Sequence, residues 1–141
     1  MKKMKKARIL AFVLVVSIAL LSAAFVSCEK KDEGNVLGSG KTSFTLKITD
    51  KEGAVREYKV KTDEKTVGDA LIKIGYAPEE SKAAGYINKL DGVEGFTDDE
   101  GNMWYWSFDV NGEYSEDGVF QVEVKAGDVY GFTYMMFTME E

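Results

Sequence analysis

The residues best suited to binding chemistry are aromatic and lie together in the stretch 102–120. Both tryptophans of the chain, Trp104 and Trp106, belong to this stretch. Because side chains alternate between the two faces of a strand, Trp104, Trp106 and Phe108 would share one face and Tyr105 the other. Rings at every second position either fill a core or form a surface on which a flat ligand can stack. The residues of this stretch leave both possibilities open.

The side chains that serve most catalytic and metal sites are missing from the sequence. It contains no histidine, which is the usual general base and the commonest metal ligand. Its only cysteine is Cys28, so neither nucleophilic triads nor Cys/His zinc sites are available. The acidic residues cluster in turn-like segments, and the oxygen-rich run 98–102 lacks the spacing of an EF-hand loop. We therefore expect a protein that is not an enzyme and has no metal site.

The first 28 residues have the pattern of a bacterial lipoprotein signal. Residues 1–8 carry five basic side chains and no acid, and residues 9–26 are apolar apart from two serines. The tetrapeptide F-V-S-C that ends at Cys28 resembles a lipobox, although the usual first residue is leucine. We expect residues 1–27 to be cleaved and Cys28 to carry the lipid that anchors the protein on the extracytoplasmic side of the cell membrane. The alternative is an uncleaved anchor, because this apolar run is just long enough to cross a bilayer.

Without that segment the chain is strongly acidic. Residues 1–27 hold five of the 18 basic residues and none of the 24 acidic ones, so 13 basic residues face 24 acidic ones and the formal net charge is −11. This charge excludes nucleic acid as a partner, because such binding depends on neutralising phosphates. Solubility is a sufficient explanation for the acidity.

The remaining chain divides into a spacer and one domain. Residues 28–41 are charged and then rich in glycine and serine, which predicts a flexible tether. Residues 42–141 are long enough to bury one core. Apolar alternation predicts a hairpin from strands at 44–49 and 54–61. A helix follows, which begins after a capping pair, Thr66 and Asp69, and ends at Gly75.

The second half of this domain has the pattern of strands. They are predicted at 86–90, 103–110, 119–124 and 129–139, and a short turn of helix precedes them between Pro78 and Gly85. Asn111-Gly112 is the strongest hairpin signal in the chain. Together the elements predict an α+β domain in which one main helix packs across a mixed sheet of four to six strands.

Three segments of the chain resemble a bacterial family of domains of unknown function that is related to the C-terminal β-domain of transcobalamin and intrinsic factor. They are G-Y-I-N-K-L-D-G-V (85–93), W-Y-W-S-F-D-V-N-G (104–112) and G-V-F-Q-V-E-V-K-A-G-D-V-Y-G-F-T-Y (118–134). The segment T-V-G-D-A-L-I-K-I-G-Y (66–76) falls where that family has its single helix. The resemblance covers nearly all of 44–137 and implies a β-grasp-like fold.

In the animal proteins this domain covers one face of cobalamin, and a separate helical domain supplies the histidine that meets cobalt. Residues 42–141 contain neither that helical domain nor a histidine. The resemblance therefore implies an apolar lid for a cobalamin-like or other planar ligand, which the protein would hand to a membrane transporter or another surface protein. The ligand-binding residues that it implies are Tyr86, Tyr105, Trp106, Phe108, Asn111 and Tyr114. The alternative is a non-catalytic protein-interaction or structural module whose aromatic rings fill the core.

Overall fold

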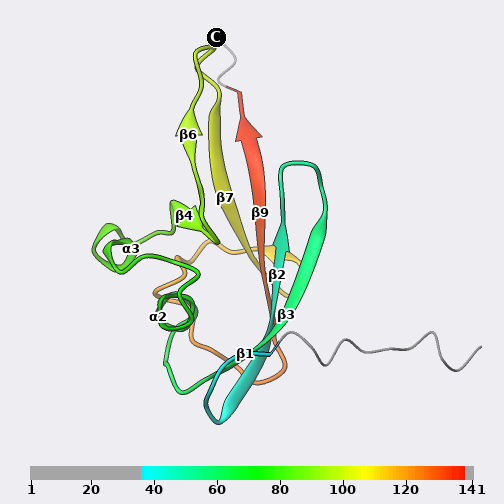
Figure 1. The fold of residues 1–141 in the computed structure, drawn as a ribbon, viewed down its shortest axis with the longest axis vertical. Helices are drawn as coiled ribbons and strands as arrows, with labels where there is room; N and C mark the ends of the chain where they lie inside the picture. Colours follow the sequence, from blue (N-terminus) through cyan, green and yellow to red (C-terminus); the bar gives the residue numbers. More distant parts are fainter. Residues whose placement is uncertain (1–35, 139–141) are drawn as a thin grey trace, which may run out of the picture. The chain divides into compact units, whose positions relative to one another are not determined.

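A seven-stranded mixed sheet organises residues 36–138, the part of the chain that this computed structural model describes (Figure 1). The strands lie in the order β1 (Val36–Gly38), β3 (Val55–Thr62), β2 (Thr42–Thr49), β9 (Val129–Phe137), β7 (Met103–Val110) and β6 (Phe96–Thr97), and β8 (Glu113–Tyr114) also pairs with β7. A separate small sheet joins β4 (Lys89–Leu90) to β5 (Val93–Glu94). Two short helices, α2 (Val67–Lys73) and α3 (Glu80–Ala84), lie on one side of the large sheet (Figure 1).

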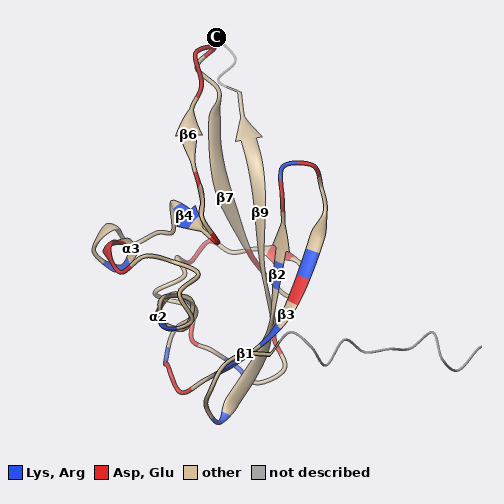
Figure 2. Cartoon of the chain, viewed as in Figure 1, with Lys and Arg blue, Asp and Glu red and all other residues tan. Residues whose placement is uncertain are grey.

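Apolar alternation along β2 determines which face of the sheet is buried. Phe44, Leu46 and Ile48 are fully buried, whereas the residues between them are only half-buried. Strand β2 pairs antiparallel with β3 in the predicted hairpin and parallel with β9 on its other side. The last strand of the described chain therefore lies at the centre of the sheet, where Tyr130 pairs with Leu46. Figure 2 shows that β9 and most of β7 carry no charged residues, as expected for strands at the centre of a core.

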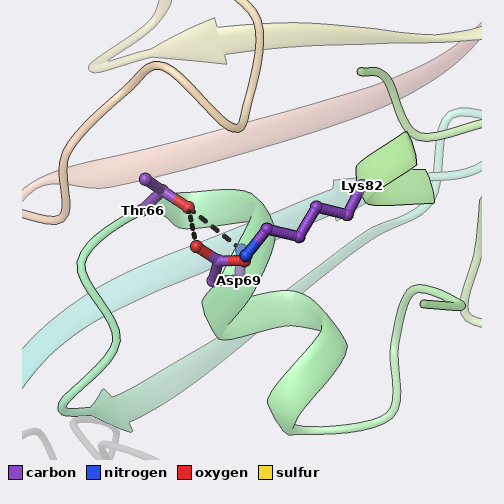
Figure 3. A network of polar contacts seen from close by, with 3 residues as sticks. All are labelled: Thr66, Asp69 and Lys82. Carbon is purple, nitrogen blue, oxygen red and sulfur yellow. Dashed lines mark hydrogen bonds and ion pairs between the residues drawn. The ribbon is translucent and has the colours of Figure 1, made fainter. Parts of the chain in front are cut away.

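The main helix begins at the capping pair that the sequence predicts. Thr66 Oγ1 accepts a hydrogen bond from the backbone N–H of Asp69 (3.2 Å) and donates one to Asp69 Oδ2 (2.8 Å). Lys82 of α3 donates to the other carboxylate oxygen of Asp69 (2.7 Å), so the cap of one helix is joined to the next helix (Figure 3). The Lys82 ammonium, through this hydrogen bond, is the main cause that lowers the pKa of Asp69. The buried face of α2, with Val67 and Leu71 fully buried, packs against the sheet.

We expect the Thr66→Ala substitution to lower the free energy of unfolding by about 1 kcal/mol relative to the wild-type chain. The substitution removes the acceptor for the Asp69 N–H and the donor to the Asp69 carboxylate. Both groups remain at the start of α2 and lose their hydrogen bond to the Thr66 hydroxyl. Urea denaturation followed by circular dichroism measures the change. Thr66→Ser, which keeps the hydroxyl, is the matched control, and an equal loss in both variants would show that the methyl group rather than the cap matters.

Several predicted elements are wrong. The sheet has seven strands rather than four to six and a second small sheet is present, so the described domain is mostly β. The two helices lie where the sequence predicts the main helix and the short helical turn, and both are short. The stretch 119–124 was predicted as a strand but forms turns, with one isolated bridge between Glu123 and Thr66. Its carbonyl groups are used elsewhere: Val119 O and Val122 O accept from the first N–H groups of α2, at Gly68 and Val67. Those donors have no partner inside the helix, so this segment satisfies the start of α2 instead of joining the sheet.

The predicted tether also ends too late. Residues 36–38 form β1, which pairs parallel with β3, and Lys41 N donates to Asp63 Oδ1 (2.8 Å). Residues 36–41 therefore belong to the folded domain. The predicted signal peptide 1–27, the lipid attachment at Cys28 and the tether residues 28–35 lie outside the described residues. Within 36–138, no helix is long and apolar enough to cross a membrane.

Candidate functional site

The face of β7 that carries the tryptophans is turned mainly toward the core. Trp106 and Phe108 each keep only 8% of their surface exposed. Phe108 stacks on Phe132 of the neighbouring strand at a centroid distance of 5.0 Å. The indole N–H of Trp106 donates to the carbonyl oxygen of Val93 (2.9 Å). Of the two possibilities for the aromatic strand, a core or a ligand surface, the side chains of Trp106 and Phe108 therefore belong to the core.

The other tryptophan lies at the more open end of the same face. Trp104 is half-buried between the rings of Phe96 (6.4 Å) and Tyr134 (5.6 Å), and Lys51 Nζ lies 4.4 Å from its ring centroid. Tyr134 continues the aromatic row to Trp106 at 4.9 Å. The Tyr134 hydroxyl donates to Glu94 O (2.8 Å), and burial raises the pKa of this phenol. The row of rings therefore runs from a half-exposed end into the core.

A cavity of about 310 Å³ lies beside the middle of β7. Its walls come from three segments that are far apart in the sequence, 86–88, 105–108 and 114–119, together with Phe132. We call this cavity and its walls the aromatic cleft. Five of the six residues predicted to bind a ligand line it: Tyr86, Tyr105, Trp106, Phe108 and Tyr114.

Two of these rings are the accessible ones. Tyr86 is 61% exposed and Tyr114 is 74% exposed. Tyr86 follows Gly85, whose positive φ of 81° ends α3. Tyr114 lies on β8, directly after a turn whose two residues, Asn111 and Gly112, both have positive φ (52° and 85°). The helix end and the hairpin turn that the sequence predicts thus place these rings at the same cleft.

The sixth predicted residue, Asn111, does not line the cleft. Its side-chain oxygen accepts from the N–H of Val129 (2.9 Å), and its own N–H donates to Val129 O (2.7 Å). Asn111 therefore joins the hairpin turn to the start of β9. Its side chain is therefore used within the fold and does not form part of the cavity wall.

The cleft also contains polar residues that the sequence analysis did not single out. Asn88, Ser115, Glu116 and Asp117 line it, and among residues 36–138 the two acids are its only charged wall residues. The run 115–118 has the composition of a turn and directly follows the aromatic hairpin, and this position is the signal that could have identified it. The described walls of the cleft carry no cationic side chain, so they favour neutral or cationic groups over anions.

A second cavity of about 280 Å³ adjoins the first, because Tyr86 and Asn88 line both. Its other walls include Glu80, Lys89 and Glu94. Tyr86 thus stands between a largely aromatic cleft and a more polar hollow beside α3. Among residues 36–138, no group of three His, Cys, Asp or Glu side chains is placed to hold a metal ion.

Comparison with known proteins gives a family and a fold. Residues 64–135 match the model of a family described as Domain of unknown function (DUF4430). A crystal structure of a candidate metal binding protein from Ruminococcus gnavus ATCC 29149 is similar to this chain with a TM-score of 0.60 and 19% sequence identity, over 70% of this chain and 100% of that chain. At this identity the likeness concerns the fold alone. No curated protein matches the chain.

Proposed function

The chain belongs to the DUF4430 family of domains of unknown function, and we propose that its domain is a binding module that holds one face of a flat, cobalamin-like ligand in the aromatic cleft. The observation that carries this proposal is the convergence of Tyr86, Tyr105 and Tyr114 on one cavity. These three tyrosines come from separate segments, and two of them remain largely exposed. A structural role in the core would not require rings at these exposed positions.

The size of the cleft supports a partial enclosure of such a ligand. A cavity of about 310 Å³ is at the small end of ligand sites. A corrin ring would therefore cover the mouth of the cleft, with Tyr86 and Tyr114 against its face, and one of its side groups would enter the cavity. The acidic wall residues Glu116 and Asp117 match the cationic cobalt centre of a corrinoid better than they match an anionic porphyrin.

Contact of this kind gives modest affinity. Two or three rings and the matching ligand surface remove about 300 to 400 Å² from water, which contributes roughly 8 to 10 kcal/mol before the cost of association, itself at least about 4 kcal/mol. We expect a dissociation constant between about a millimolar and tens of micromolar. Tight binding would require a second protein on the other face of the ligand. A membrane transporter or another surface protein that receives the ligand fits this requirement.

The proposal includes the cell-surface location and the absence of catalysis. A lipid on Cys28 would hold the domain on the extracytoplasmic side of the membrane, close to such a transporter. The sheet order is consistent with a β-grasp-like assignment, in which a hairpin (β2 and β3) precedes the helix and the final strand returns parallel to the first hairpin strand. We propose binding and transfer of the ligand without a chemical reaction.

We expect Tyr114→Ala and Tyr86→Ala each to weaken binding of cyanocobalamin and of cobinamide about fivefold to tenfold. Each substitution removes an exposed ring from the wall of the cleft and leaves the core intact. Isothermal titration calorimetry of the full-length chain measures the dissociation constants, and tryptophan fluorescence follows the same titrations. Phe137→Ala is the matched control, because it removes a 54% exposed ring that does not line the cleft.

Saturable heat below about a millimolar, reduced by the two cleft variants and unchanged by the control, would support a corrinoid-binding protein. Absence of heat from both ligands at that concentration would rule out the stand-alone cobalamin function. Equal weakening by all three variants would place the ligand outside the aromatic cleft.

One observation favours a second candidate function, a protein-interaction module. Five apolar side chains, between 40% and 54% exposed, gather where β6, β7 and β9 pair with one another: Phe96, Met103, Met135, Met136 and Phe137. Exposed apolar groups that cluster in this way often mark a protein-contact surface. A photoreactive benzophenone side chain introduced at position 137 or at position 114 distinguishes the two functions. Cross-links to a surface protein from position 137 alone would favour the interaction module.

A further inference from the structure

Strand β7 has an opening in its hydrogen-bond ladder beside the cleft. On the edge that faces away from β9, Phe96 of β6 pairs with Trp104, and the N–H of Ser115 donates to Phe108 O. Between these two positions no strand of the described chain pairs with Trp106 on that edge. We call the backbone N–H and C=O of Trp106 at this position the open rung.

The direction of the neighbouring hydrogen bonds shows where the open rung points. The N–H of Asn111 donates to Val129 O, next to β9, whereas Phe108 O accepts from Ser115 on the opposite side. In an antiparallel strand the N–H and C=O of one residue point to the same side, and this side alternates along the chain. The N–H and C=O of Trp106 therefore point as those of Phe108 do, away from β9.

The aromatic cleft lies against this edge. Tyr105, Trp106, Ser107 and Phe108 all line it, although successive side chains of a strand point to opposite faces. One cavity can touch all four only if it runs along the edge of the strand. The indole N–H of Trp106 already donates to Val93 O and the residue lines the cleft, so a ligand in the cleft would meet its backbone rather than its indole N–H.

The free length of the β7 edge around the open rung is too short for an added peptide strand. Residues 96 and 115 block the edge on either side, and the four-residue interval from Trp104 to Phe108 spans only about 14 Å at about 3.4 Å per residue. One planar amide group, with an N–H donor beside a C=O acceptor, fits this space and matches both groups of Trp106. A carboxylate supplies no donor and would be repelled by Glu116 and Asp117.

We propose that the cleft selects ligands that carry a carboxamide, which pairs with the backbone N–H and C=O of Trp106. This inference rests on the proposed function and names the group by which the ligand is recognised. It separates ligands with amide side groups from equally flat ligands whose side groups are acids or esters. Recognition by backbone also explains how a cleft with few polar side chains can be selective.

The test compares two ligands with the same macrocycle and the full-length chain. Dicyanocobinamide has carboxamide side groups, whereas the heptamethyl ester of cobyrinic acid keeps the carbonyl acceptors and loses every amide donor. We expect the ester to bind about tenfold more weakly, because Trp106 C=O loses its partner. Amide hydrogen exchange measured by NMR gives an independent readout, in which dicyanocobinamide slows the exchange of the Trp106 N–H.

Equal affinity for both macrocycles, with unchanged exchange at Trp106, would overturn the amide inference and leave the planar-ligand function standing. If neither macrocycle binds, the proposed function fails, and a small probe then decides the inference. Acetamide should shift and protect the Trp106 amide at high concentration more strongly than methyl acetate, which can accept from the Trp106 N–H but cannot donate to its C=O. The absence of any selective change at Trp106 with this probe would also overturn the inference.

Discussion

Replacing Phe132 by alanine is expected to lower the free energy of unfolding by about 3 to 5 kcal/mol, one of the two largest effects that we predict. Phe132 is 1% exposed and stands at the centre of β9, where it stacks on Phe108 and pairs with Ile48. Removing its ring leaves a void that the paired strands on both sides cannot fill without breaking their register. Urea denaturation monitored by circular dichroism measures the loss.

Phe137→Ala is the control for this experiment, because it makes the same substitution at the exposed end of the same strand. We expect this variant to change the free energy of unfolding by less than about 0.5 kcal/mol. Similar losses in the two variants would mean that the exposed end of β9 is covered in solution, by a partner or by another part of the chain.

Replacing Trp106 by alanine is expected to destabilise the domain by a similar amount, about 3 to 5 kcal/mol. The variant loses a buried ring that packs on Tyr134, and it leaves Val93 O without its indole donor. If the ring of Trp106 instead served mainly to contact a ligand from the surface, the free energy of unfolding would hardly change and only binding would suffer. The experiment therefore decides directly between the core and the surface role of this side chain.

Trp106→Phe separates the two contributions. It keeps an aromatic ring in the core but removes the hydrogen bond to Val93 O together with a small part of the ring volume, so we expect a loss of about 1 to 2 kcal/mol, less than for Trp106→Ala. Trp104 remains as the fluorescent reporter in both variants, which allows unfolding to be followed in the same way. Losses of equal size in Trp106→Phe and Trp106→Ala would show that the indole hydrogen bond, rather than packing, holds the β5 segment on the sheet.

These predictions divide the aromatic stretch into two parts with different roles. The side chains of Trp106 and Phe108 stabilise the fold, and the rings of Tyr86 and Tyr114 are available for binding. Strand β7 joins the two parts, because its buried face belongs to the core and one edge forms a wall of the cleft. The amide inference places the link at the backbone of Trp106, where the same residue anchors the core and faces the ligand.

Features that depend on a few neighbouring residues could be predicted from the sequence. Thr66 and Asp69 form the expected cap, and Asn111-Gly112 forms the expected turn with positive φ at both residues. The alternation of β7 predicts that Trp106 and Phe108 share one face, and the structure shows that this face is buried. The cap, the turn and the alternation are set by local backbone geometry, which the residue types specify directly.

Short strands and the segment 119–124 could not be predicted in the same way. Strands β1, β6 and β8 have only two or three residues, too few for an alternating pattern to show. The segment 119–124 has the composition of a strand, but its carbonyl groups bond to the start of α2, an outcome that depends on where the helix lies.

The sequence by itself thus determined the local elements, which aromatic side chains share a face of β7, and the residue types available for binding. Only the tertiary structure decided that Tyr86 and Tyr114, 28 positions apart, border one cleft, that Asn111 faces away from it, and that the ladder of β7 opens at Trp106. A cleft is made by side chains and strand edges from separate segments, and their meeting depends on how β6 and β8 end along β7. Those endpoints are set by packing and by hydrogen bonds between distant parts of the chain, which residue spacing does not encode.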